Sequence, residues 1–423
     1  MLEKRTPIPI GEALGKIMQI KAEGEIETVP LGESLDRYLA EDIEALHDVP
    51  HFNRSPYDGF ALRAADTLLA GRENPVEFEV IERLAAGMTA EKAVGPFQAA
   101  RIMTGAMLPE GADTVIMLEL VSEFEKGGSE YISIKRKQKS GENVSFKGED
   151  AKKGEKLIKK GTKINPGVIA VLAAFGYSEV KTAKRPVAGL FATGTELLEV
   201  KDPLVPGKIR NSNASMIEAQ ARRAGGEAIY FGQLPDDLEI CFEAVKNALD
   251  KVDILITTGG VSVGDFDFMP LIYKRLGAEV LFNKVAMRPG SVTTVARLGD
   301  KLLYGLSGNP SACYVGFELF VRGMFRKKLF VENLYPKKEK AWLNADFPKP
   351  NPFTRLIRSR CLIKEGRLYA EPSGLDKSSV VMSLAAADSL IILPAGSRGY
   401  QKDEEVEVLL LEDFVGSGVW GEE

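Results

Sequence analysis

The middle third of the chain alternates uniformly apolar runs with amphipathic segments. The apolar runs predict strands at 187–192, 227–234, 252–256, 278–286, 291–298 and 302–306. Apolar residues at helical spacing predict helices over 213–224, 238–250, the segment that ends at Leu276, and a long segment from residue 310 to about 328. Runs that are apolar at every position are typical of strands buried on both faces of a parallel sheet. The alternation of strands and helices therefore predicts a doubly wound α/β domain.

The segments on either side of this domain have a different pattern. Residues 10–22 predict a helix, 25–31 a strand, and 166–176 a helix that starts at a proline and stops at a glycine. Between 75 and 145, short alternating runs separated by glycine and proline turns are typical of a small β module. After Pro336, predicted strands at 356–363, 367–371, 389–393 and 405–411 indicate a C-terminal β domain, which we expect to be barrel-like.

Composition limits the classes of protein that fit. The chain has 423 residues, of which 44% are hydrophobic and 27% charged, which excludes wholesale disorder, a collagen-like repeat and a coiled-coil rod. The net charge of -5 argues against a duplex nucleic-acid binder, which usually has a basic balance. No apolar run approaches the length of a membrane span. We therefore expect no membrane and no nucleic-acid partner.

The cysteines and histidines are few. Cys241, Cys313 and Cys361 lie far apart, so we expect neither a disulfide framework nor a cysteine-rich zinc site. Residues 1–5 are not followed by an apolar segment, so we expect no secretory signal and a cytoplasmic protein. His47 and His51 are too few to bind a metal without carboxylates, and we interpret them as structural.

Candidate chemistry lies where four of the predicted strands end. The loops at 193–196, 235–237, 257–267 and 307–310 each follow a strand, and such loops meet at one edge of a parallel sheet. Their glycines let backbone N–H groups approach an anion closely. Carboxylates beside a phosphate group require a divalent cation between them, and these loops contain Glu196, Asp236, Asp265 and Asp267. Together they predict a Mg²⁺ site with a phosphorylated ligand.

Each loop alone also has an ordinary interpretation. Thr-Gly-Thr-Glu at 193–196 fits a turn with a helix cap, and Asp236-Asp237 fits a plain N-cap. The loop at 257–265 is harder to explain as a turn, because it has three glycines within six residues. There is no Walker-type Gly-Lys-Ser and no dinucleotide G-x-G-x-x-G in its strand-turn-helix setting.

Two basic segments are candidates for an oxyanion site. Lys284 and Arg288 come at the end of the strand predicted at 278–286 and precede Pro289-Gly290, so they either bind an anion or form a solvated basic edge. Arg358 and Arg360 share one face of a C-terminal strand. That face either binds an anion or is simply exposed to solvent, and the pattern alone favours a solvent-exposed face. The segment 51–60 fits an ordinary turn, and its many polar groups modestly favour a role in a functional site.

Several motifs in this order resemble those of one family. The motifs are Ser-Pro-Tyr-Asp-Gly-Phe-Ala at 55–61, Arg-Ile-Met-Thr-Gly-Ala at 101–106, Pro-Glu-Gly-Ala-Asp at 109–113, Gly-Glu-Asp at 148–150, Thr-Gly-Thr-Glu-Leu at 193–197, Thr-Thr-Gly-Gly-Val-Ser-Val-Gly at 257–264 and Gly-Asn-Pro at 308–310. They resemble the molybdopterin molybdenumtransferase (MoeA) family, related to the C-terminal part of gephyrin. The resemblance covers essentially the whole chain.

The resemblance implies an activity and an assembly. Members of the family insert molybdate into adenylylated molybdopterin with Mg²⁺-dependent release of AMP, the last step of molybdenum cofactor biosynthesis. They are typically homodimers. Partners implied are the substrates adenylylated molybdopterin and molybdate, and, less directly, the upstream molybdopterin adenylyltransferase and recipient molybdoenzymes. The implied domains are a MogA-like molybdopterin-binding α/β domain (1–30 and 183–330), a linking domain (31–53 and 141–182), an inserted β-rich domain (54–140) and a C-terminal β-barrel domain (331–423).

The resemblance also implies roles for individual residues. The catalytic positions would be Asp58, Thr104, Asp150, Glu196, Asp236 and Asp267. The substrate-binding positions would be Thr193, Gly194, Gly259, Gly260, Ser262, Gly264, Ser307, Gly308 and Asn309. Molybdate would contact Lys284, Arg288, Pro289, Arg360 and Ser378, and Mg²⁺ would contact members of the set Glu196, Asp236, Asp265 and Asp267.

The chain departs from the family pattern at the basic segment. Arg288-Pro289-Gly290-Ser291-Val292 stands where Lys-Pro-Gly-Lys-Pro is common, and Ser311-Ala312 follows Asn-Pro where Val-Ser is common. Thr195 stands where an acidic or polar residue is frequent. Arginine binds oxyanions with a different geometry from lysine, so the preference for molybdate or tungstate stays open.

Two other functions stay open besides metal insertion. One is the adenylyltransferase of the same pathway, which would need only the α/β domain. The other is a gephyrin-like scaffold, although the chain lacks a long linker or an additional domain. Release of AMP on adding molybdate would separate an insertase from a scaffold.

Overall fold

The computed structural model describes residues 5–260 and 268–411. These residues form two compact units. The first contains the described parts of 1–41, 160–165 and 179–423, and the second contains 42–159 and 166–178. The predicted four-domain division stays a prediction. β1 (Ile26–Pro30) ends at its boundary at residue 30, and β10 (Glu179–Ala183), which pairs with β1, crosses its boundary at residue 182.

The first unit contains a six-stranded sheet with the order β14-β11-β15-β19-β18-β16. The strands are β11 (Val187–Thr193), β14 (Glu227–Leu234), β15 (Ile254–Thr258), β16 (Glu279–Phe282), β18 (Thr294–Leu298) and β19 (Lys301–Leu306). The first four in the spatial order are parallel, which confirms the α/β expectation. β18 is antiparallel to both neighbours, because Gly299-Asp300 joins it to β19 as a two-residue hairpin turn.

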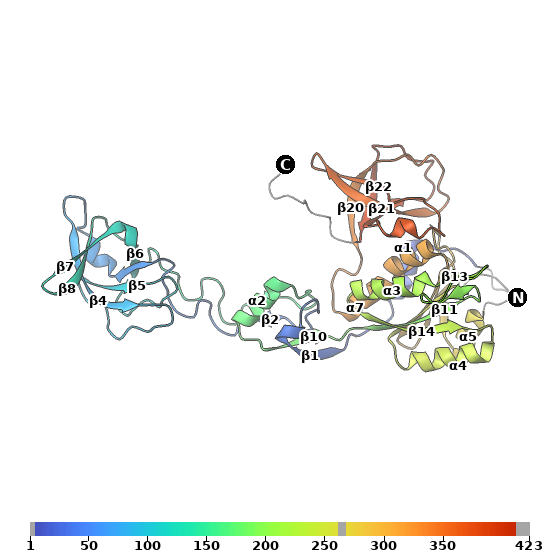
Figure 1. Ribbon diagram of the computed structural model, residues 1–423, viewed down its shortest axis with the longest axis horizontal. Coiled ribbons are helices and arrows are strands. Elements are labelled where there is room, and N and C mark those ends of the chain that lie inside the picture. The colour runs from blue at the N-terminus through green and yellow to red at the C-terminus, as the bar shows by residue number, and fades with distance from the viewer. Residues whose placement is uncertain (1–4, 261–267, 412–423) are drawn as a thin grey trace. The chain divides into compact units, whose positions relative to one another are not determined.

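Helices cover both faces of this sheet (Figure 1). On one face lie α1 (Ile10–Met18), α3 (Ser212–Arg223), α6 (Pro310–Gly316) and α7 (Arg322–Lys328), and on the other lie α4 (Leu238–Leu249) and α5 (Met269–Leu276). Along β19, Tyr304 packs in the cluster of the first face and Leu303 in that of the second. This two-sided burial explains why the central strands are apolar at every position.

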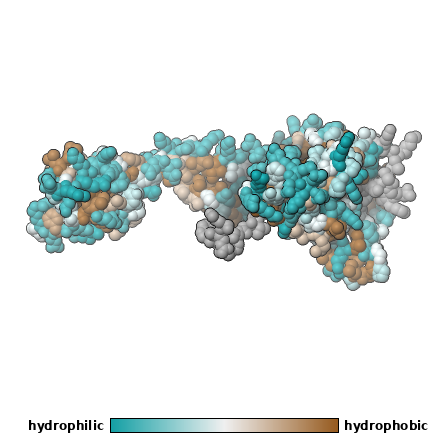
Figure 2. Space-filling model, turned by 90° about the horizontal axis from the view of Figure 1, so that it is seen from above, coloured by the Kyte–Doolittle hydropathy of each residue, from teal (hydrophilic) through white to brown (hydrophobic). Residues whose placement is uncertain are grey.

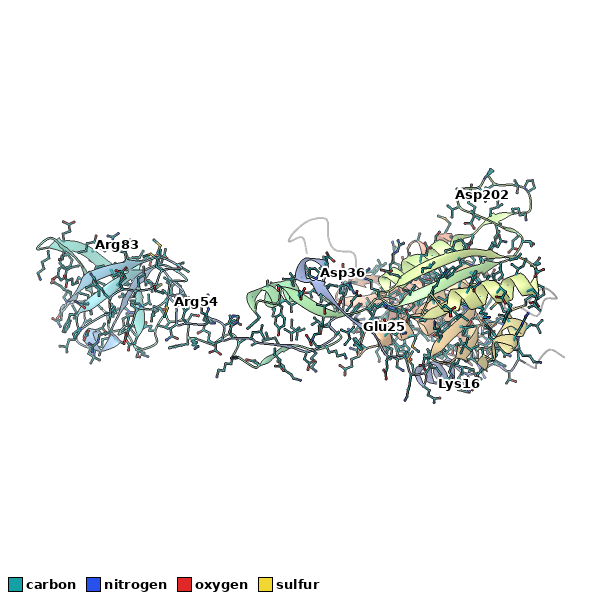
Figure 3. The ribbon with its side chains drawn as sticks, turned by 90° about the horizontal axis from the view of Figure 1, so that it is seen from below. Lys16, Glu25, Asp36, Arg54, Arg83 and Asp202 are labelled. Atoms are coloured by element: carbon teal, nitrogen blue, oxygen red, sulfur yellow. The ribbon has the colours of Figure 1, made fainter. Side chains whose placement is uncertain are left out.

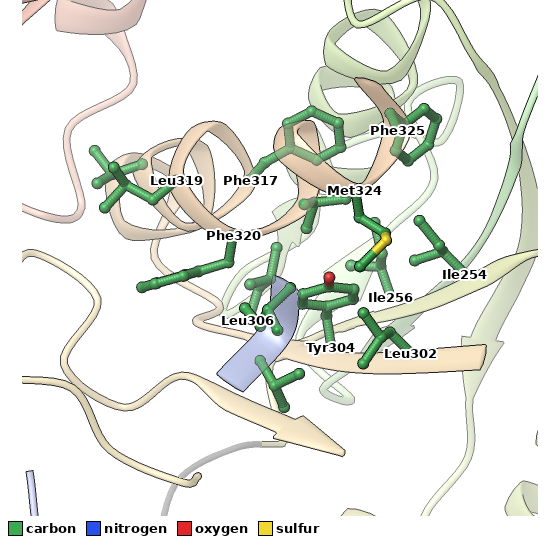
Figure 4. Packing of buried hydrophobic residues seen from close by; sticks show 14 of the residues in the cluster. Ile254, Ile256, Leu302, Tyr304, Leu306, Phe317, Leu319, Phe320, Met324 and Phe325 are labelled. Atoms are coloured by element: carbon green, nitrogen blue, oxygen red, sulfur yellow. The ribbon is translucent and has the colours of Figure 1, made fainter. Parts of the chain in front are cut away.

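A π-helical turn divides the predicted long helix at 310–328. The segment Phe317–Val321 joins α6 to α7, and all of its residues are buried. Phe320 of this segment and Met324 of α7 point toward Tyr304 and Leu306 of β19, whereas Phe317 and Phe325 lie on the other side of the helix (Figure 4). The ring centroids of Phe317 and Phe325 lie 6.0 Å apart, within the range of favourable aromatic pairs.

The chain turns tightly between α3 and β14 at Gly225-Gly226. A Cβ atom on Gly226 would stand 2.1 Å from Cε1 of Phe325 and 2.6 Å from the carbonyl oxygen of Pro186. We expect Gly226→Ala to lower the free energy of unfolding by about 1–3 kcal/mol, the usual cost of overpacking. Denaturant unfolding of the full chain measures it.

Gly15→Ala is the matched control, because a Cβ at that position of α1 meets no atom within 4 Å. Alanine is the better helix former, so this substitution should be neutral or stabilising. Equal unfolding midpoints for the two variants would contradict the close approach at Gly226.

The C-terminal part of the first unit is a closed barrel. Its strands are β20 (Lys337–Leu343), β21 (Thr354–Lys364), β22 (Arg367–Pro372), β23 (Ser389–Leu393) and β24 (Glu405–Leu410). Their order is β21-β22-β20-β24-β23, and β23 pairs back with β21, which confirms the barrel-like expectation. Sequence patterning missed β20, because its first four residues are Lys-Lys-Glu-Lys. The short strand β17 (Met287–Arg288) adds to β21 from the α/β part.

The second unit is built on a second six-stranded sheet, which confirms the β-rich module expected between 75 and 145. Its strands are β3 (Gly59–Leu62), β4 (Val76–Leu84), β5 (Gln98–Ile102), β6 (Thr114–Met117), β7 (Val121–Lys126) and β8 (Ser129–Ile134). The unit also contains β2 (Ile43–Glu44), β9 (Lys156–Ile158) and α2 (Pro166–Ala174). Four short 3₁₀ helices occur in the described residues of the two units, at Leu31–Glu33, Ala64–Thr67, Leu118–Leu120 and Met382–Leu384.

The surface and the cysteines agree with the composition. Hydrophilic residues cover much of the face of each unit that Figure 2 draws. Cys241, Cys313 and Cys361 are buried and free, as expected from their spacing. Among the described residues, no helix combines the length and the apolar character needed to cross a bilayer.

Candidate functional site

The carboxyl ends of the four parallel strands open into one cavity of 890 Å³, called the strand-end cavity below. All four predicted loops contribute to it, so the sheet does bring them together. The predicted residues that line it are Thr193, Gly194, Glu196, Asp236, Gly259, Gly260, Ser307, Gly308 and Asn309. Ser262 and Gly264 lie outside the described residues.

Glycines allow the first and third of these loops to touch. A Cβ atom on Gly259 would lie 2.7 Å from the carbonyl oxygen of Thr193, and one on Gly260 would lie 2.8 Å from its Oγ1. Both glycines also have positive φ angles, 80° and 60°. The Thr193 hydroxyl donates a 3.1 Å hydrogen bond to the carbonyl of Thr258, which ties the loops together. Larger residues at these two positions would push the loops apart and change the cavity wall.

Helix caps decide which carboxylates face the cavity. Asp237 is the N-cap of α4 and accepts a 3.0 Å hydrogen bond from the N–H of Ile240. Asp236, one residue earlier, lines the cavity instead. The helix α3 begins after Asn211, which accepts from the N–H of Ala214, rather than after Asn213 as expected. Asn213 lies within the helix and donates a 2.8 Å hydrogen bond to the carbonyl of Gly308.

Two of the four predicted Mg²⁺ ligands, Glu196 and Asp236, line the strand-end cavity. The other two, Asp265 and Asp267, lie outside the described residues. Within the described part of the chain, no cluster of three or more potential metal ligands occurs. Two carboxylates beside backbone N–H groups suit a hard cation that keeps water and phosphate among its ligands, so the residues present fit Mg²⁺.

Two short paired strands contribute to one wall of this cavity. β12 (Leu197–Leu198) pairs with β13 (Ile209–Arg210), and Asp202 lies on the extended loop between them (Figure 3). Arg210 lines the cavity and donates a 3.1 Å hydrogen bond to the carbonyl of Asp202. Sequence reasoning missed Arg210, Asn211 and Asn213, although the run Arg-Asn-Ser-Asn just before an amphipathic helix was a usable signal.

A second cavity of 460 Å³, called the Arg288 cavity, adjoins the first. Val292, Ser307 and Asn309 line both. Of the residues expected to bind molybdate, Arg288, Pro289 and Ser378 line the Arg288 cavity. The barrel contributes Arg355 and Asp376, and the segment before β21 contributes Lys349. A substrate in the strand-end cavity would therefore lie next to a basic pocket.

The charges in the Arg288 cavity are not all available to a ligand. Arg355 Nε donates a 2.9 Å hydrogen bond to Asp376 Oδ2. Arg288 and Lys349 form no ion pair with any described residue, and the Arg288 guanidinium lies 5.9 Å from the ring centroid of Phe353. Arg288 and Lys349 are thus the cations best placed to attract a tetrahedral dianion.

Lys284 and Arg360 do not line either cavity. The carbonyl of Lys284 accepts a 3.2 Å hydrogen bond from the N–H of Ile8. Arg360 pairs with Glu371 at 2.8 Å on the exposed side of β21. The structure brings Arg288, Pro289 and Ser378 together, and it places Arg355 and Lys349 where sequence reasoning put Lys284 and Arg360.

Arg358 is buried, whereas the sequence pattern favoured a solvent-exposed position for it. It is 2% exposed, because the segment that follows β22 covers it. Its Nε donates 3.0 Å to the Ser383 hydroxyl, and its Nη2 donates 3.2 Å to the carbonyl of Leu375. Burial lowers the pKa of Arg358, the Asp376 carboxylate raises it, and Arg355 lowers it further. Arg358 therefore holds the 375–383 segment, which includes Ser378, against the barrel.

The remaining predicted catalytic residues belong to the second unit. Thr104 donates to Asp58 Oδ1 from its backbone N–H at 2.7 Å and from its hydroxyl at 2.9 Å. The backbone bond, followed by the hydroxyl bond, lowers the pKa of Asp58 below its ordinary value. Asp150 is exposed, and its backbone N–H donates to the carbonyl of Val49. The pairing of Asp58 with Thr104 gives the unit a fixed, ionised carboxylate on its surface.

This pairing predicts a measurable pKa. We expect the pKa of the Asp58 carboxyl to lie below its ordinary value and Thr104→Val to raise it, because one of two hydrogen bonds to the carboxylate is lost. The backbone bond, which lowers the pKa most, remains in this variant. Carbon-13 NMR of the carboxyl carbon measures the pKa. Thr89→Val, at an exposed threonine of the same unit, should leave the value unchanged. An unaltered Asp58 pKa in Thr104→Val would contradict the pairing.

Comparison with known protein families matches three successive parts of the chain. Residues 8–176 match the MoeA N-terminal region (domain I and II), 189–327 a probable molybdopterin binding domain, and 340–411 the MoeA C-terminal region (domain IV). The fold and the strand-end cavity therefore define a protein of the molybdopterin-binding class.

Relatives cover the full length of the chain. The molybdopterin molybdenumtransferase of Bacillus subtilis (strain 168) is 60% identical over 417 residues, which is 99% of this chain and 97% of the relative. That of Staphylococcus aureus (strain COL) is 49% identical over 412 residues, 97% of each chain. The crystal structure of the molybdopterin biosynthesis MoeA protein from Pyrococcus horikosii superposes with a TM-score of 0.84 at 32% identity, over 97% of this chain and 100% of that one. The chain belongs to the MoeA family.

Proposed function

We propose that the chain is a molybdopterin molybdenumtransferase, which inserts molybdate into adenylylated molybdopterin as the final step of molybdenum cofactor biosynthesis. Relatives of this name match it along almost its full length. The observation that most supports the activity here is the shared wall of the two cavities. Val292, Ser307 and Asn309 separate a cavity for a large phosphorylated ligand from a basic pocket for an oxyanion.

In this proposal the strand-end cavity binds the pterin phosphate ester and its adenylyl group. The loops at 193–196, 257–260 and 307–310 would surround the ligand, and Arg210 would add a positive charge. Glu196 and Asp236 would hold Mg²⁺, with Asp265 and Asp267 as further candidates. Bound Mg²⁺ would neutralise phosphate charge at the scissile link.

Molybdate would bind in the Arg288 cavity, opposite the dithiolene. Arg288 and Lys349 would balance its double charge, and the Ser307 hydroxyl and Asn309 amide lie on the wall shared with the other ligand. In the cleavage step an oxygen of water or molybdate attacks the adenylyl phosphorus, and the molybdopterin phosphate leaves with the electron pair of the broken P–O bond. Attack by water gives AMP and releases a proton to solvent, whereas attack by molybdate gives adenylyl-molybdate, which water then hydrolyses to AMP and molybdate. No side chain has to act as the nucleophile.

The finer parts of the proposal concern assembly and location. Asp58, Thr104 and Asp150 would take part in the reaction, and we propose a cytoplasmic homodimer. The upstream adenylyltransferase would supply the substrate, and molybdoenzymes would receive the product. Sedimentation of the purified chain tests the dimer directly.

The experiment that tests the function is AMP release from adenylylated molybdopterin with Mg²⁺. It compares no oxyanion, molybdate and tungstate. Release that depends on molybdate supports the proposal, and a preference for tungstate would point to the altered segment around Arg288. Folded protein that releases no AMP with either oxyanion would refute it and leave a scaffold as the better account.

A further inference from the structure

A third cavity, far from the strand ends, has no part in the proposed reaction. It has a volume of 1320 Å³ and lies within the first unit, beside α7 and the start of β20. Three arginines line it, Arg223, Arg322 and Arg326, and we call it the arginine cavity. The rest of its lining is Tyr38, Lys163, Glu332, Asn333, Leu334, Tyr335, Pro336, Lys337, Leu410 and Leu411.

Two of the three guanidinium groups, those of Arg223 and Arg322, pair with one buried carboxylate. Glu318 is 1% exposed and pairs with Arg223 at 2.5 Å and with Arg322 at 2.7 Å. At the rim, Lys163 pairs with Asp36 and Lys337 with Glu339, so the lysines have partners of their own. Glu332 is the one acidic residue of the lining, and it is exposed. The arginine end of the cavity therefore has an excess of positive charge.

Hydrogen-bond donors at this end also lack acceptors. Arg322 is 6% exposed, yet its Nε has no hydrogen-bond partner among the described residues. The same holds, over the same part of the chain, for the buried Nε of Arg326, whose Nη1 donates 3.0 Å to the carbonyl of Asn333. A buried donor without an acceptor is costly, and proteins usually satisfy it with water, a ligand or a partner.

Repulsion adds to this cost. Arg322 and Arg326 are four residues apart on α7, so they lie on one face of the helix, and like charges at this spacing destabilise it. Burial, followed by the charge of Arg322, lowers the pKa of Arg326, although Tyr38 and Glu318 raise it. An anion between the two guanidiniums would relieve the repulsion and satisfy both Nε donors.

We propose that the arginine cavity binds a phosphate monoester of a small organic molecule, with the phosphate at Arg322 and Arg326. Guanidinium groups bind phosphate through paired, charge-assisted hydrogen bonds, and a phosphate offers several acceptor oxygens. The organic part has a suitable wall in Tyr38, Leu334, Tyr335 and Leu411. The inference does not depend on the proposed function, because it concerns none of the residues in the other two cavities.

Isothermal titration calorimetry at fixed ionic strength tests this with two probes, phenyl phosphate and inorganic phosphate. We expect saturable binding of phenyl phosphate to the full chain, and weaker binding of inorganic phosphate, which lacks the organic part. Arg326→Gln should weaken phenyl phosphate binding about tenfold or more, since one charge-assisted contact is lost. Arg275→Gln, at an exposed arginine paired with Glu239, is the matched control and should bind normally.

Other outcomes would overturn the proposal. Absence of binding to the unaltered chain would do so, as would equal binding by Arg326→Gln. Binding that Arg288→Gln removes and Arg326→Gln keeps would place the phosphate in the Arg288 cavity. A dimer in sedimentation that Arg326→Gln dissociates, with no binding of either probe, would identify a second copy of the chain as the occupant instead.

Folding of the variant is checked by thermal unfolding. Arg326→Gln removes a repelled charge, so its unfolding temperature should stay near that of the unaltered chain. Phenyl phosphate should raise the unfolding temperature of the unaltered chain and of Arg275→Gln, because a ligand that binds only the folded state stabilises it. It should raise that of Arg326→Gln much less.

Discussion

Replacing Glu318 by alanine should lower the free energy of unfolding of the first unit by about 3–5 kcal/mol, the usual result of leaving buried charges without a partner. Glu318 lies in the π-helical turn between α6 and α7 and is 1% exposed. It accepts hydrogen bonds from Gln220 at 2.6 Å, Arg223 at 2.5 Å and Arg322 at 2.7 Å. Burial lowers the pKa of Arg223, but Glu318 and Tyr314 outweigh this and raise it above its ordinary value.

The size of the effect follows from what the substitution leaves behind. Without Glu318, two largely buried guanidiniums lose their shared counter-ion and must be hydrated or repel each other. The carboxylate also joins α3, through Gln220 and Arg223, to α7, through Arg322. The loss should therefore loosen the helix layer on that face of the sheet. Denaturant or calorimetric unfolding of the full chain measures it, as the shift of the transition that involves the first unit.

Glu239→Ala is the matched control, because it breaks an exposed ion pair. Glu239 pairs with Arg275 at 2.6 Å, and the two side chains are 68% and 43% exposed. Exposed pairs contribute about 0–1 kcal/mol, so this variant should unfold almost like the unaltered chain. If Glu318→Ala were no less stable than Glu239→Ala, the buried network would not contribute to the free energy of unfolding as we expect.

Local patterning predicted which loops meet at one edge of the α/β sheet, because strand ends can be located from local sequence. Thr193, Asp236, Gly259 and Asn309 each follow a strand whose apolar run is evident, and parallel strands place their ends at one edge of a sheet. Strand direction was the weak point. The Gly299-Asp300 hairpin reverses β18, and its two-residue turn was present in the sequence but was not used.

Local sequence patterns did not predict contacts between segments that are distant in the sequence. The 375–383 segment covers Arg358 on β21 and buries it. Arg355 of the same strand lines the Arg288 cavity. Period-two spacing predicted only which residues share a face of the strand. Lys349 is one lysine among many in the sequence, and only the closed barrel brings it to the site. The neutralisation of Glu318 by two arginines likewise depends on how α3 and α7 pack. Such sites depend on tertiary packing rather than on periodicity.

Asp236→Asn should reduce the rate of Mg²⁺-dependent AMP release about a hundredfold or more, without loss of folding. Loss of a group that only supports a metal ligand costs up to about a hundredfold, and a direct ligand should cost at least as much. Glu196→Gln should have a similar effect, because Glu196 lines the same cavity. Both variants should require more Mg²⁺ for half-maximal rate, which distinguishes weaker metal binding from a general loss of activity. Rates are measured over a Mg²⁺ series, with circular dichroism and thermal unfolding as checks of folding.

Asp237→Asn is the matched control, because it separates loss of the cavity carboxylate from a general loss of charge near α4. It removes the same charge one residue away, and asparagine caps a helix as well as aspartate does. Asp237 accepts the hydrogen bond from Ile240 at the start of α4, whereas Asp236 lines the strand-end cavity. We therefore expect Asp237→Asn to keep nearly full activity at the usual Mg²⁺ concentration. Equal loss in both variants would mean that charge near α4 matters in general. Full activity in Asp236→Asn would exclude this carboxylate from the metal site and leave Glu196, Asp265 and Asp267 as its candidates.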